Sequence, residues 1–431
     1  MFAKFKDIFA KRNKDLRKRI LFTLGALAIF IVGTNVRVPG TQKVTSDLGF
    51  LELLNVIGGG AIKNSSIFAL GVMPYISASI VIQLLQMDIV PYFSDLAKEG
   101  YAGRRKLNRI TRYLGIFVAF VQGVAMSVGL LGAEAATFDY IKMSVILTAG
   151  TAFLLWLGDQ VTQKGVGNGL SLIIMAGIVV SIPYMMEEAF KTFVLGNENL
   201  FIGIISFLVY LAIYFAIVVG VVFISESERR IPIQYANKTT SAYGAKQTYI
   251  PFKVNAANVI PVIFASAILT IPQVLARFIT NEGYIKFVNN YMNYNTPIGL
   301  TIYLLLIVAF SYIYTILQFR PEEISKNLQQ NGGYIPGVRP GTETKKYITT
   351  VLLRITTFGT LFLVVIAALP ILFQNYSHVE NTNISIGGTG LIIVVGVALE
   401  LYKQIESVLE QKYIKEDFNE VHYINCSSSC R

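Results

Sequence analysis

The stretch that decides the fold is a six-residue sequence that occurs twice, as Pro74-Tyr75-Ile76-Ser77-Ala78-Ser79 and as Pro261-Val262-Ile263-Phe264-Ala265-Ser266. The two copies share Pro, Ile, Ala and Ser at the same offsets, and each lies in the second long apolar segment of its own half of the chain. Chance could explain the identities, but not the equivalent placement. Repeats with an odd number of spans must lie inverted relative to one another, so that matched segments face each other near the bilayer midplane.

The composition around these copies is that of a polytopic membrane protein. The chain has 431 residues, of which 53% are hydrophobic and 15% are charged. Its mean hydropathy of +0.55 is far above that of a soluble domain of this length. The net charge of +11 could suggest a nucleic-acid partner. However, the basic residues lie beside apolar segments, where topology and attraction to anionic lipids account for most of them.

Ten apolar segments are long enough to cross a hydrocarbon core of about 30 Å, which needs about 20 residues. We therefore predict an all-α membrane protein of ten transmembrane helices in two inverted five-helix halves, residues 20–200 and 201–409. A basic cytoplasmic segment, 1–19, precedes them, and a cytoplasmic tail, 410–431, follows. The predicted spans are 20–36, 67–87, 113–132, 143–158, 169–186, 201–224, 254–276, 298–319, 347–373 and 390–409.

The distribution of Lys and Arg predicts the orientation. With the N-terminus inside, cytoplasmic segments hold 29 of the 37 basic residues and external segments hold 7, as the positive-inside rule requires. Both termini are therefore expected in the cytoplasm. The basic start leads into the first span without a small-residue cleavage site, so we expect this span to remain as an anchor.

The segment that precedes the first repeat copy is unsuited to a lipid-facing helix. Residues 51–66 read LELLNVIGGGAIKNSS, with three consecutive glycines and Lys63. Each glycine costs about 1 kcal/mol relative to alanine in a helix, and a lysine is costly at bilayer depth. Irregular backbone is tolerated there only where protein or a water-filled cavity surrounds it. Two interpretations stay open: a short half-helix that dips into a cavity, or an external loop with some helical content.

The segment with the second repeat copy is also interrupted. Pro261 and Pro272 each remove a backbone donor and clash with the preceding turn, so we expect a kink or local unwinding. Amide side chains could hydrogen-bond between helices here, at well under about 2 kcal/mol per contact, and form a junction that opens at little cost. They could equally serve ordinary helix packing. These amides are Gln83, Gln86, Gln122, Asn255 and Asn258.

Two cytoplasmic loops, 225–253 and 320–346, are longer than simple connections between adjacent helices require. The first carries Arg229 and Arg230. In the second, closely spaced Pro and Gly specify turns that would present Arg339 at a fixed tip. Long loops in compact proteins are often functional. We interpret both loops as a docking surface for a cytosolic partner; the alternative is a merely solvated surface.

No pattern in the sequence indicates catalysis. A coupled transporter usually places charged residues near the midplane, and the central parts of these spans are almost free of them. His378 and His422, the only histidines, fall in a loop and in the tail. We find no HExxH motif, nucleophile elbow or Gly-rich phosphate loop in the required context. We therefore expect no enzyme activity, no catalytic residue, no cofactor and no metal.

Six separated blocks of this sequence closely resemble the SecY family, the pore subunits of the bacterial protein translocase. They agree with that family in sequence, in order and in predicted topology, from the first span to about residue 409. The blocks are FALGVMPYISASIVIQLL (68–85), EGYAGRRKLNRITRY (99–113), GVGNGLSLIIMAGIV (165–179), SERRIPIQYA (227–236), KVNAANVIPVIFASAIL (253–269) and GGYIPGVRPG (332–341).

The resemblance implies a clamshell around an hourglass channel, in which the second and seventh helices line a lateral gate. A ring of apolar side chains resists wetting when closed and holds back ions without a charged filter. By motif position, the pore ring would be Ile76, Ile80, Ile174, Ile263 and Ile393; the plug would include Asn55, Gly58, Gly59, Gly60 and Ala61; and the lateral gate would include Gln83, Gln86, Gln122, Asn258 and Pro261.

The function implied by the resemblance is a passive conduit in the cytoplasmic membrane for unfolded preproteins and for membrane proteins that leave sideways into the lipid. A signal peptide would part the gate helices and displace the plug. The SecA motor or a translating ribosome would push against Arg229, Arg230 and Arg339, and SecE and SecG would be companion subunits. The alternatives are an inverted-repeat secondary transporter of a small solute and a purely structural scaffold.

Overall fold

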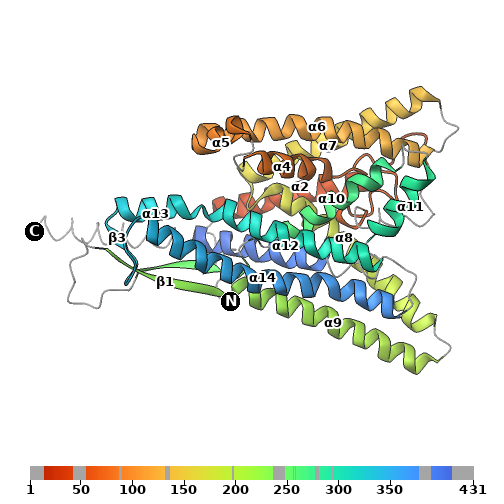
Figure 1. Cartoon of the computed structure of the whole chain (residues 1–431). Helices are drawn as coiled ribbons and strands as arrows, with labels where there is room; N and C mark the ends of the chain where they lie inside the picture. Colours follow the sequence, from red (N-terminus) through yellow and green to blue (C-terminus); the bar gives the residue numbers. More distant parts are fainter. Residues whose placement is uncertain are drawn as a thin grey trace, which may run out of the picture.

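Long helices that run side by side form most of the molecule, and a small sheet stands at one end of them (Figure 1). Predicted features that fall on 1–13, 51–54, Asn258 and 410–431 lie outside the part that the structure describes. The computed structural model describes residues 14–41, 55–86, 90–131, 136–196, 199–235, 248–255, 257, 259–276, 281–293, 296–377 and 390–409.

The N-terminal half contains a helix for each of its five predicted spans. The short helix α5 follows the second of these, and a π-helical turn, η2, ends the fifth. Their bounds are α2 Lys14–Thr34, α4 Met73–Leu85, α5 Pro91–Lys98, α6 Tyr101–Leu131, α7 Thr137–Lys164, α8 Gly169–Phe190 and η2 Lys191–Leu195.

The C-terminal half also contains a helix for each of its five predicted spans. We call the helix at 390–409 the last helix. The other bounds are α9 Leu200–Glu226, β1 Glu228–Tyr235, β2 Thr248–Lys253, α10 Ile260–Leu275, α11 Glu282–Tyr291, α12 Pro297–Phe319, α13 Pro321–Gln330, β3 Gly333–Tyr334 and α14 Thr342–Ser377.

Both repeat copies begin helices. Pro74 and Pro261 are each the second residue of their helix, where a missing donor costs nothing because the first turn has no intrahelical acceptor. The helices start six residues later than the predicted spans 67–87 and 254–276. The expected interruption at Pro261 is therefore a helix start and not a kink. Both helices are shorter than the six in the described residues that have the length and hydropathy of a membrane span.

The two long loops meet in a three-stranded sheet of order β2-β1-β3. The central strand β1 pairs antiparallel with β2, from Glu228↔Lys253 to Ile233↔Thr248, and with β3 at Gln234↔Tyr334. The fold is thus helical except for this sheet, which the sequence did not predict. The apolar face of the sheet packs on α13 and α14 through Ile231, Ile233, Phe252, Leu328, Ile335, Ile348 and Leu352.

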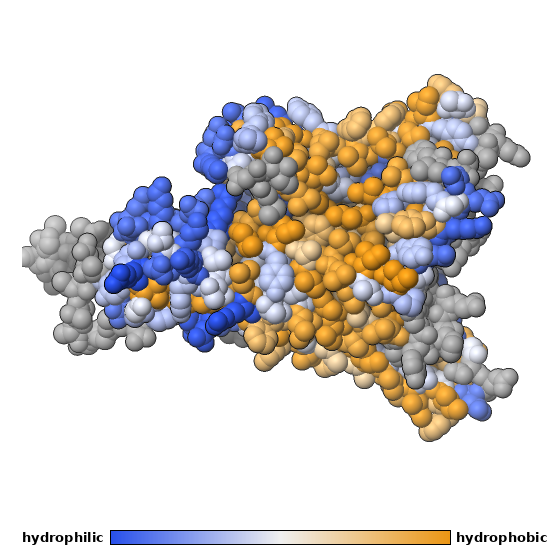
Figure 2. Space-filling view, in the orientation of Figure 1, coloured by the Kyte–Doolittle hydropathy of each residue, from blue (hydrophilic) through white to orange (hydrophobic). Residues whose placement is uncertain are grey.

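The surface separates into an apolar band and two polar ends. Hydrophobic side chains cover the helices, and hydrophilic side chains gather beyond them (Figure 2). We call the end with the sheet, α5 and α13 the sheet end, and the opposite end, where α11 lies, the α11 end (Figure 1). Phe201, Phe215 and Phe223 of α9 are more than two-thirds exposed. Such a band is expected of helices that face lipid.

Candidate functional site

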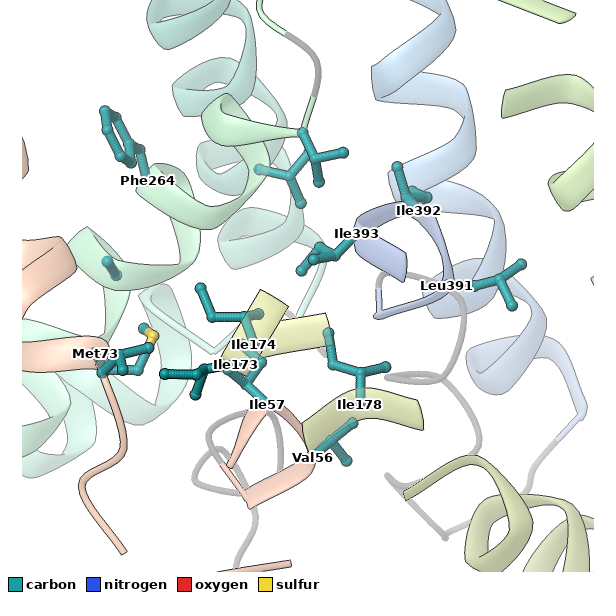
Figure 3. Close-up of a cluster of buried hydrophobic side chains, with 14 of the residues drawn as sticks. Val56, Ile57, Met73, Ile173, Ile174, Ile178, Phe264, Leu391, Ile392 and Ile393 are labelled. Atoms are coloured by element: carbon teal, nitrogen blue, oxygen red, sulfur yellow. The ribbon is translucent and has the colours of Figure 1, made fainter. Parts of the chain in front are cut away.

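The five isoleucines predicted for the pore ring lie in one cluster of apolar side chains that joins the two halves. Ile80, Ile174 and Ile393 are buried, and Ile76 and Ile263 are partly buried and pack against the cluster. They come from α4 and α8 in one half and from α10 and the last helix in the other. The cluster has members from both halves, and Figure 3 shows two of the predicted ring residues, Ile174 and Ile393, within it.

A cavity of about 450 Å³ lies against three of these isoleucines, Ile174, Ile263 and Ile393. Its walls also include residues from β2 and α12, so it extends from the ring towards the sheet end. We call this cavity the vestibule; its remaining walls combine apolar residues with polar and charged ones. The polar and charged residues that line it are Asn168, Ser171, Ser225, Lys253, Asn255, Tyr314, Gln318, Glu400 and Lys403.

Three groups of residues, which we call levels, follow one another along α8 from its N-cap Asn168. Asn168 and Ser171 line the vestibule, Ile174 belongs to the ring, and Gly177 and Ser181 contact the segment 55–66. At a rise of 1.5 Å per residue, the levels follow one another along a single helix. The segment 55–66 therefore lies on the far side of Ile174 from the vestibule.

The contact between this segment and α8 is close enough to involve the backbone. Ser181 Oγ donates a hydrogen bond to the Val56 carbonyl at 3.2 Å. A Cβ on Gly177 would lie 2.1 Å from the Ile57 carbonyl oxygen, so only glycine fits there. Gly59, with a φ of +69°, approaches the same glycine. The side chains of Val56 and Ile57 join the ring cluster (Figure 3).

The predicted plug residues are folded into this segment and are not on an exposed loop. Among the described residues, helical backbone at 55–57 is followed by hydrogen-bonded turns. Asn55 accepts a hydrogen bond from the Gly60 amide at its backbone oxygen, at 2.8 Å, and one from the Lys63 amide at Oδ1, at 3.0 Å. The Lys63 ammonium lies 5.4 Å from the centre of the Tyr184 ring, which offsets part of its desolvation. Of the predicted plug residues, Asn55, Gly58, Gly59 and Ala61 are buried and Gly60 is partly buried.

Helices α4 and α10 contact each other where the halves meet and run in opposite directions. Near the end of α4, Gln83 and Gln86 line a cavity with residues of α13 at the sheet end. Towards the end of α10, Gln273 donates a hydrogen bond to the Met292 carbonyl beside α11. Ile76 and Ile263 are each three residues after the start of their helix. Both helices therefore start near the ring and leave it towards opposite ends of the molecule.

The cavity lined by the two glutamines has a volume of about 550 Å³ and separates the halves at the sheet end. We call it the seam cavity. Gln122 is not among its lining residues, and Pro261 is buried in α10. Its polar residues are Tyr75, Ser79, Gln83, Gln86, Arg104, Asn108 and Thr111 on the N-terminal side and Tyr314, Gln318, Arg320, Glu323 and Asn327 on the C-terminal side.

Most of these cavity residues were missed from the sequence, although one signal was present. Arg104, Asn108 and Thr111 follow one another at spacings of four and three residues. That spacing places them on one face of a helix. This basic stretch precedes the predicted span 113–132, and the shared face of the three residues is the only local sign that α6 lines the seam cavity.

The predicted docking arginines of β1 differ in their surroundings. The Arg230 guanidinium hydrogen-bonds Glu228 at 2.6 Å and stacks 4.8 Å above the Tyr249 ring. The hydrogen bond that the Arg230 guanidinium donates to Glu228, followed by the electrostatic influence of Tyr249, raises the pKa of Arg230. Arg229 is exposed. Arg230 is thus occupied within the sheet, whereas Arg229 projects from it.

The turn that carries Arg339 has a defined backbone. Gly337 and Gly341 adopt φ values of +82° and +96°, which favour glycine. Thr344 Oγ1 donates a hydrogen bond to the Arg339 carbonyl at 2.9 Å. The guanidinium is exposed, and the described residues offer it no hydrogen-bond or ion-pair partner. The geometry is that of a cation at the tip of an ordered turn.

Comparison with known proteins identifies what the chain is similar to. A family model described as SecY matches residues 66–402. The protein translocase subunit SecY of Staphylococcus aureus (strain NCTC 8325 / PS 47) is 45% identical over 417 residues, which cover 94% of this chain and 97% of that protein.

Solved structures share the fold at lower identity. One described as "The structure of a protein conducting channel" has a TM-score of 0.63 at 17% identity and covers 91% of this chain and 92% of its own. A SecY structure, whose plug domain is described as stabilising the closed state of the translocation channel, has a TM-score of 0.60, 17% identity and the same coverage. Sec61 in a canine ribosome-channel complex has a TM-score of 0.60, 18% identity and again the same coverage.

Proposed function

The chain belongs to the SecY family, and from that premise we propose that it forms a channel through which unfolded preproteins cross the cytoplasmic membrane and from which membrane proteins pass sideways into the lipid. The observation that carries this proposal is the order of levels along α8. A vestibule with polar and charged residues in its walls, an apolar ring and a packed segment beyond the ring follow one another at the junction of two inverted halves.

The ring supplies the permeability barrier. Its isoleucine side chains offer no hydrogen bonds, so a narrow passage between them does not wet and ions do not cross. For the same reason the ring does not hold a polar chain that passes through it. The segment 55–66 acts as the plug, since its backbone closes against Gly177 and Ser181 beyond the ring.

Opening requires α4 and α10 to separate. An apolar signal peptide enters between them and replaces the apolar contacts that each helix loses. Because both helices start near the ring, their separation widens the ring and releases the plug at the same point. We assign Gln83, Gln86, Gln122, Asn258 and Pro261 to the lateral gate, and the polar lining of the seam cavity keeps the sheet end of the junction weakly held.

Energy for transport comes from a partner at the sheet end, which we assign to the cytoplasm together with both chain termini. SecA or a translating ribosome docks there through Arg229, Arg230 and Arg339. The fold shared with Sec61 in a ribosome-channel complex supports a ribosome partner. SecE and SecG complete the complex in the membrane.

The transporter alternative is not favoured. The family consists of translocase subunits that form a channel and are not enzymes. The vestibule also ends at an apolar ring, where a coupled transporter would place charged or polar ligands for its solute.

Translocation into vesicles tests the proposal. The purified chain, together with a SecE-type subunit, is reconstituted and supplied with SecA, ATP and a preprotein. The preprotein is expected to become protected from added protease, and a preprotein without its signal peptide is expected to stay accessible. Saturable uptake of a small solute without protection of either preprotein would overturn the proposal in favour of a transporter.

A further inference from the structure

Arg320 connects α12 to α13 in a backbone conformation that arginine rarely adopts. Its φ of +40° and ψ of +72° are left-handed, and in the described residues only Ser65 shares a positive φ among non-glycine residues. The conformation is unfavourable because Cβ approaches the following carbonyl oxygen. Pro321 follows directly and restricts the backbone further. A glycine or an asparagine would serve the turn with less strain, so the arginine side chain itself needs an explanation.

The side chain reaches across the boundary between the halves. The Arg320 guanidinium donates from Nη1 to Glu323 Oε1 at 2.8 Å and to the Ala97 carbonyl at 3.5 Å. Ala97 is the penultimate residue of α5. Carbonyls in the last turn of a helix lack an intrahelical donor and carry the negative end of the helix dipole. Arg320 therefore supplies, from the C-terminal half, a cation and a donor to a helix end of the N-terminal half.

A second attraction crosses the same boundary. Hydrogen bonding and charge from Lys345 lower the pKa of Glu322, and Lys326 and Lys98 lower it further. Lys98 ends α5, whereas the other two lysines belong to the C-terminal half. Glu322 is well exposed, so this attraction is screened by salt and is weaker than the direct contact of Arg320.

These contacts bridge the mouth of the seam cavity. Ala97 and Arg320 both line that cavity, on opposite sides. Any widening of the cavity that moves α5 away from α13 breaks the bond between them. The bond is partly exposed, so water can replace it when it breaks, and the loss is modest.

We propose that Arg320 is a positioning residue that holds the sheet end of the seam closed, by clasping the Ala97 carbonyl at the end of α5. The clasp sets how much free energy the apolar contacts of a signal peptide must supply before α4 and α10 separate. This inference rests on the proposed channel function. A partly exposed charged hydrogen bond corresponds to roughly a fivefold shift between closed and open states.

The test replaces Arg320 by asparagine, which tolerates the left-handed backbone and is too short to reach α5. The matched control is Lys326→Asn, which removes one positive charge from an exposed position of the same helix. Spin labels at Tyr92 on α5 and Gln330 on α13, with Cys426 and Cys430 replaced by serine, report the separation of the two helices. The long-distance population is expected to rise roughly fivefold in Arg320→Asn and to stay unchanged in the control.

A transport measurement separates this role from a merely local one within α13. The rate for a preprotein whose signal peptide has a shortened apolar core is divided by the rate for the full-length signal. Arg320→Asn is expected to raise this ratio several-fold, whereas Lys326→Asn leaves it unchanged. An unchanged ratio together with an unchanged distance distribution would overturn the clasp. If Arg320→Asn does not fold, Arg320→Gly takes its place, because glycine adopts the turn without strain.

Failure of the channel function itself gives a different result. In that case the unaltered protein transports neither preprotein, while the label distances still show whether Arg320 holds α5 to α13.

Discussion

At the scale of single residues, the proposed pore ring depends on isoleucine side chains, which neither donate nor accept hydrogen bonds. Ile263 is three residues into α10 and lines the vestibule with Ile174 and Ile393. Replacing it with asparagine is expected to ease wetting of the ring and to raise ion conductance in vesicles or planar bilayers. Ile263→Leu keeps an apolar side chain of the same size and is expected to leave conductance at its original level. Equal conductance of the asparagine and leucine variants would remove Ile263 from the barrier.

Gly177 permits the direct backbone contact of α8 with the proposed plug, the segment 55–66. Alanine there would place Cβ 2.1 Å from the Ile57 carbonyl oxygen, so the plug must shift. We expect Gly177→Ala to lower the free energy of unfolding by about 1–3 kcal/mol, as overpacking does, and to raise ion leakage.

Gly25→Ala is the matched control for this variant. It makes the same change within helix α2, where a Cβ would meet nothing within 4 Å. It is expected to be neutral or to stabilise by up to about 1 kcal/mol through helix propensity. Thermal unfolding and ion flux measured on both variants decide the matter: similar behaviour of the two would mean that the plug does not rest on α8.

At the scale of elements, the sequence predicted where the ten helices lie but not where all of them begin. Helices α2, α6, α7 and α14 begin before their predicted spans, and α4 and α10 begin six residues after theirs. A proline inside an apolar run reads as a kink, yet the same proline is well suited to the first turn of a helix. Helices α4 and α10 start at Met73 and Ile260 because the residues before them pack against other parts of the molecule. Val254, for example, lies with its carbonyl against Gly359 of α14. Such neighbours come from distant parts of the chain.

The three-stranded sheet also depends on contacts between distant residues that local sequence does not predict. The turn at Arg339 follows from local glycines and prolines and could be predicted, and the structure shows it as an ordered turn. The pairing of Gln234 with Tyr334 joins residues 100 apart, and no local pattern specifies it. Two loops that seemed separate in the sequence are therefore one surface.

The proposed docking role belongs to the turn that carries Arg339. Arg339→Glu is expected to impair SecA-driven transport several-fold with little change in thermal stability, because the guanidinium has no partner among the described residues. Lys346→Glu is a comparison in the same region. Lys346 lies within α14, after the turn tip, and its ammonium is 3.7 Å from a carboxylate oxygen of Glu343. Normal SecA-dependent transport by Arg339→Glu would exclude the turn as a docking site.

At the scale of the whole molecule, two half-length helices start near a shared ring and run to opposite ends. This arrangement explains why an internal repeat of only six residues indicates the architecture: each copy places a proline at a helix start and an isoleucine two residues later. The ring could be assigned from family resemblance together with the repeat. The seam cavity could not, since its walls come from five helices whose packing no single segment reveals.

The central claim is that a polypeptide passes through this ring. A photocrosslinker at Ile80 or Ile263, with a preprotein stalled during translocation, tests it most directly. Phe215 on α9, which is 69% exposed in the apolar band, is the control position. Adducts with the stalled preprotein are expected at both isoleucines and not at Phe215. Absence of adducts at both isoleucines, or equal yields at all three positions, would contradict it.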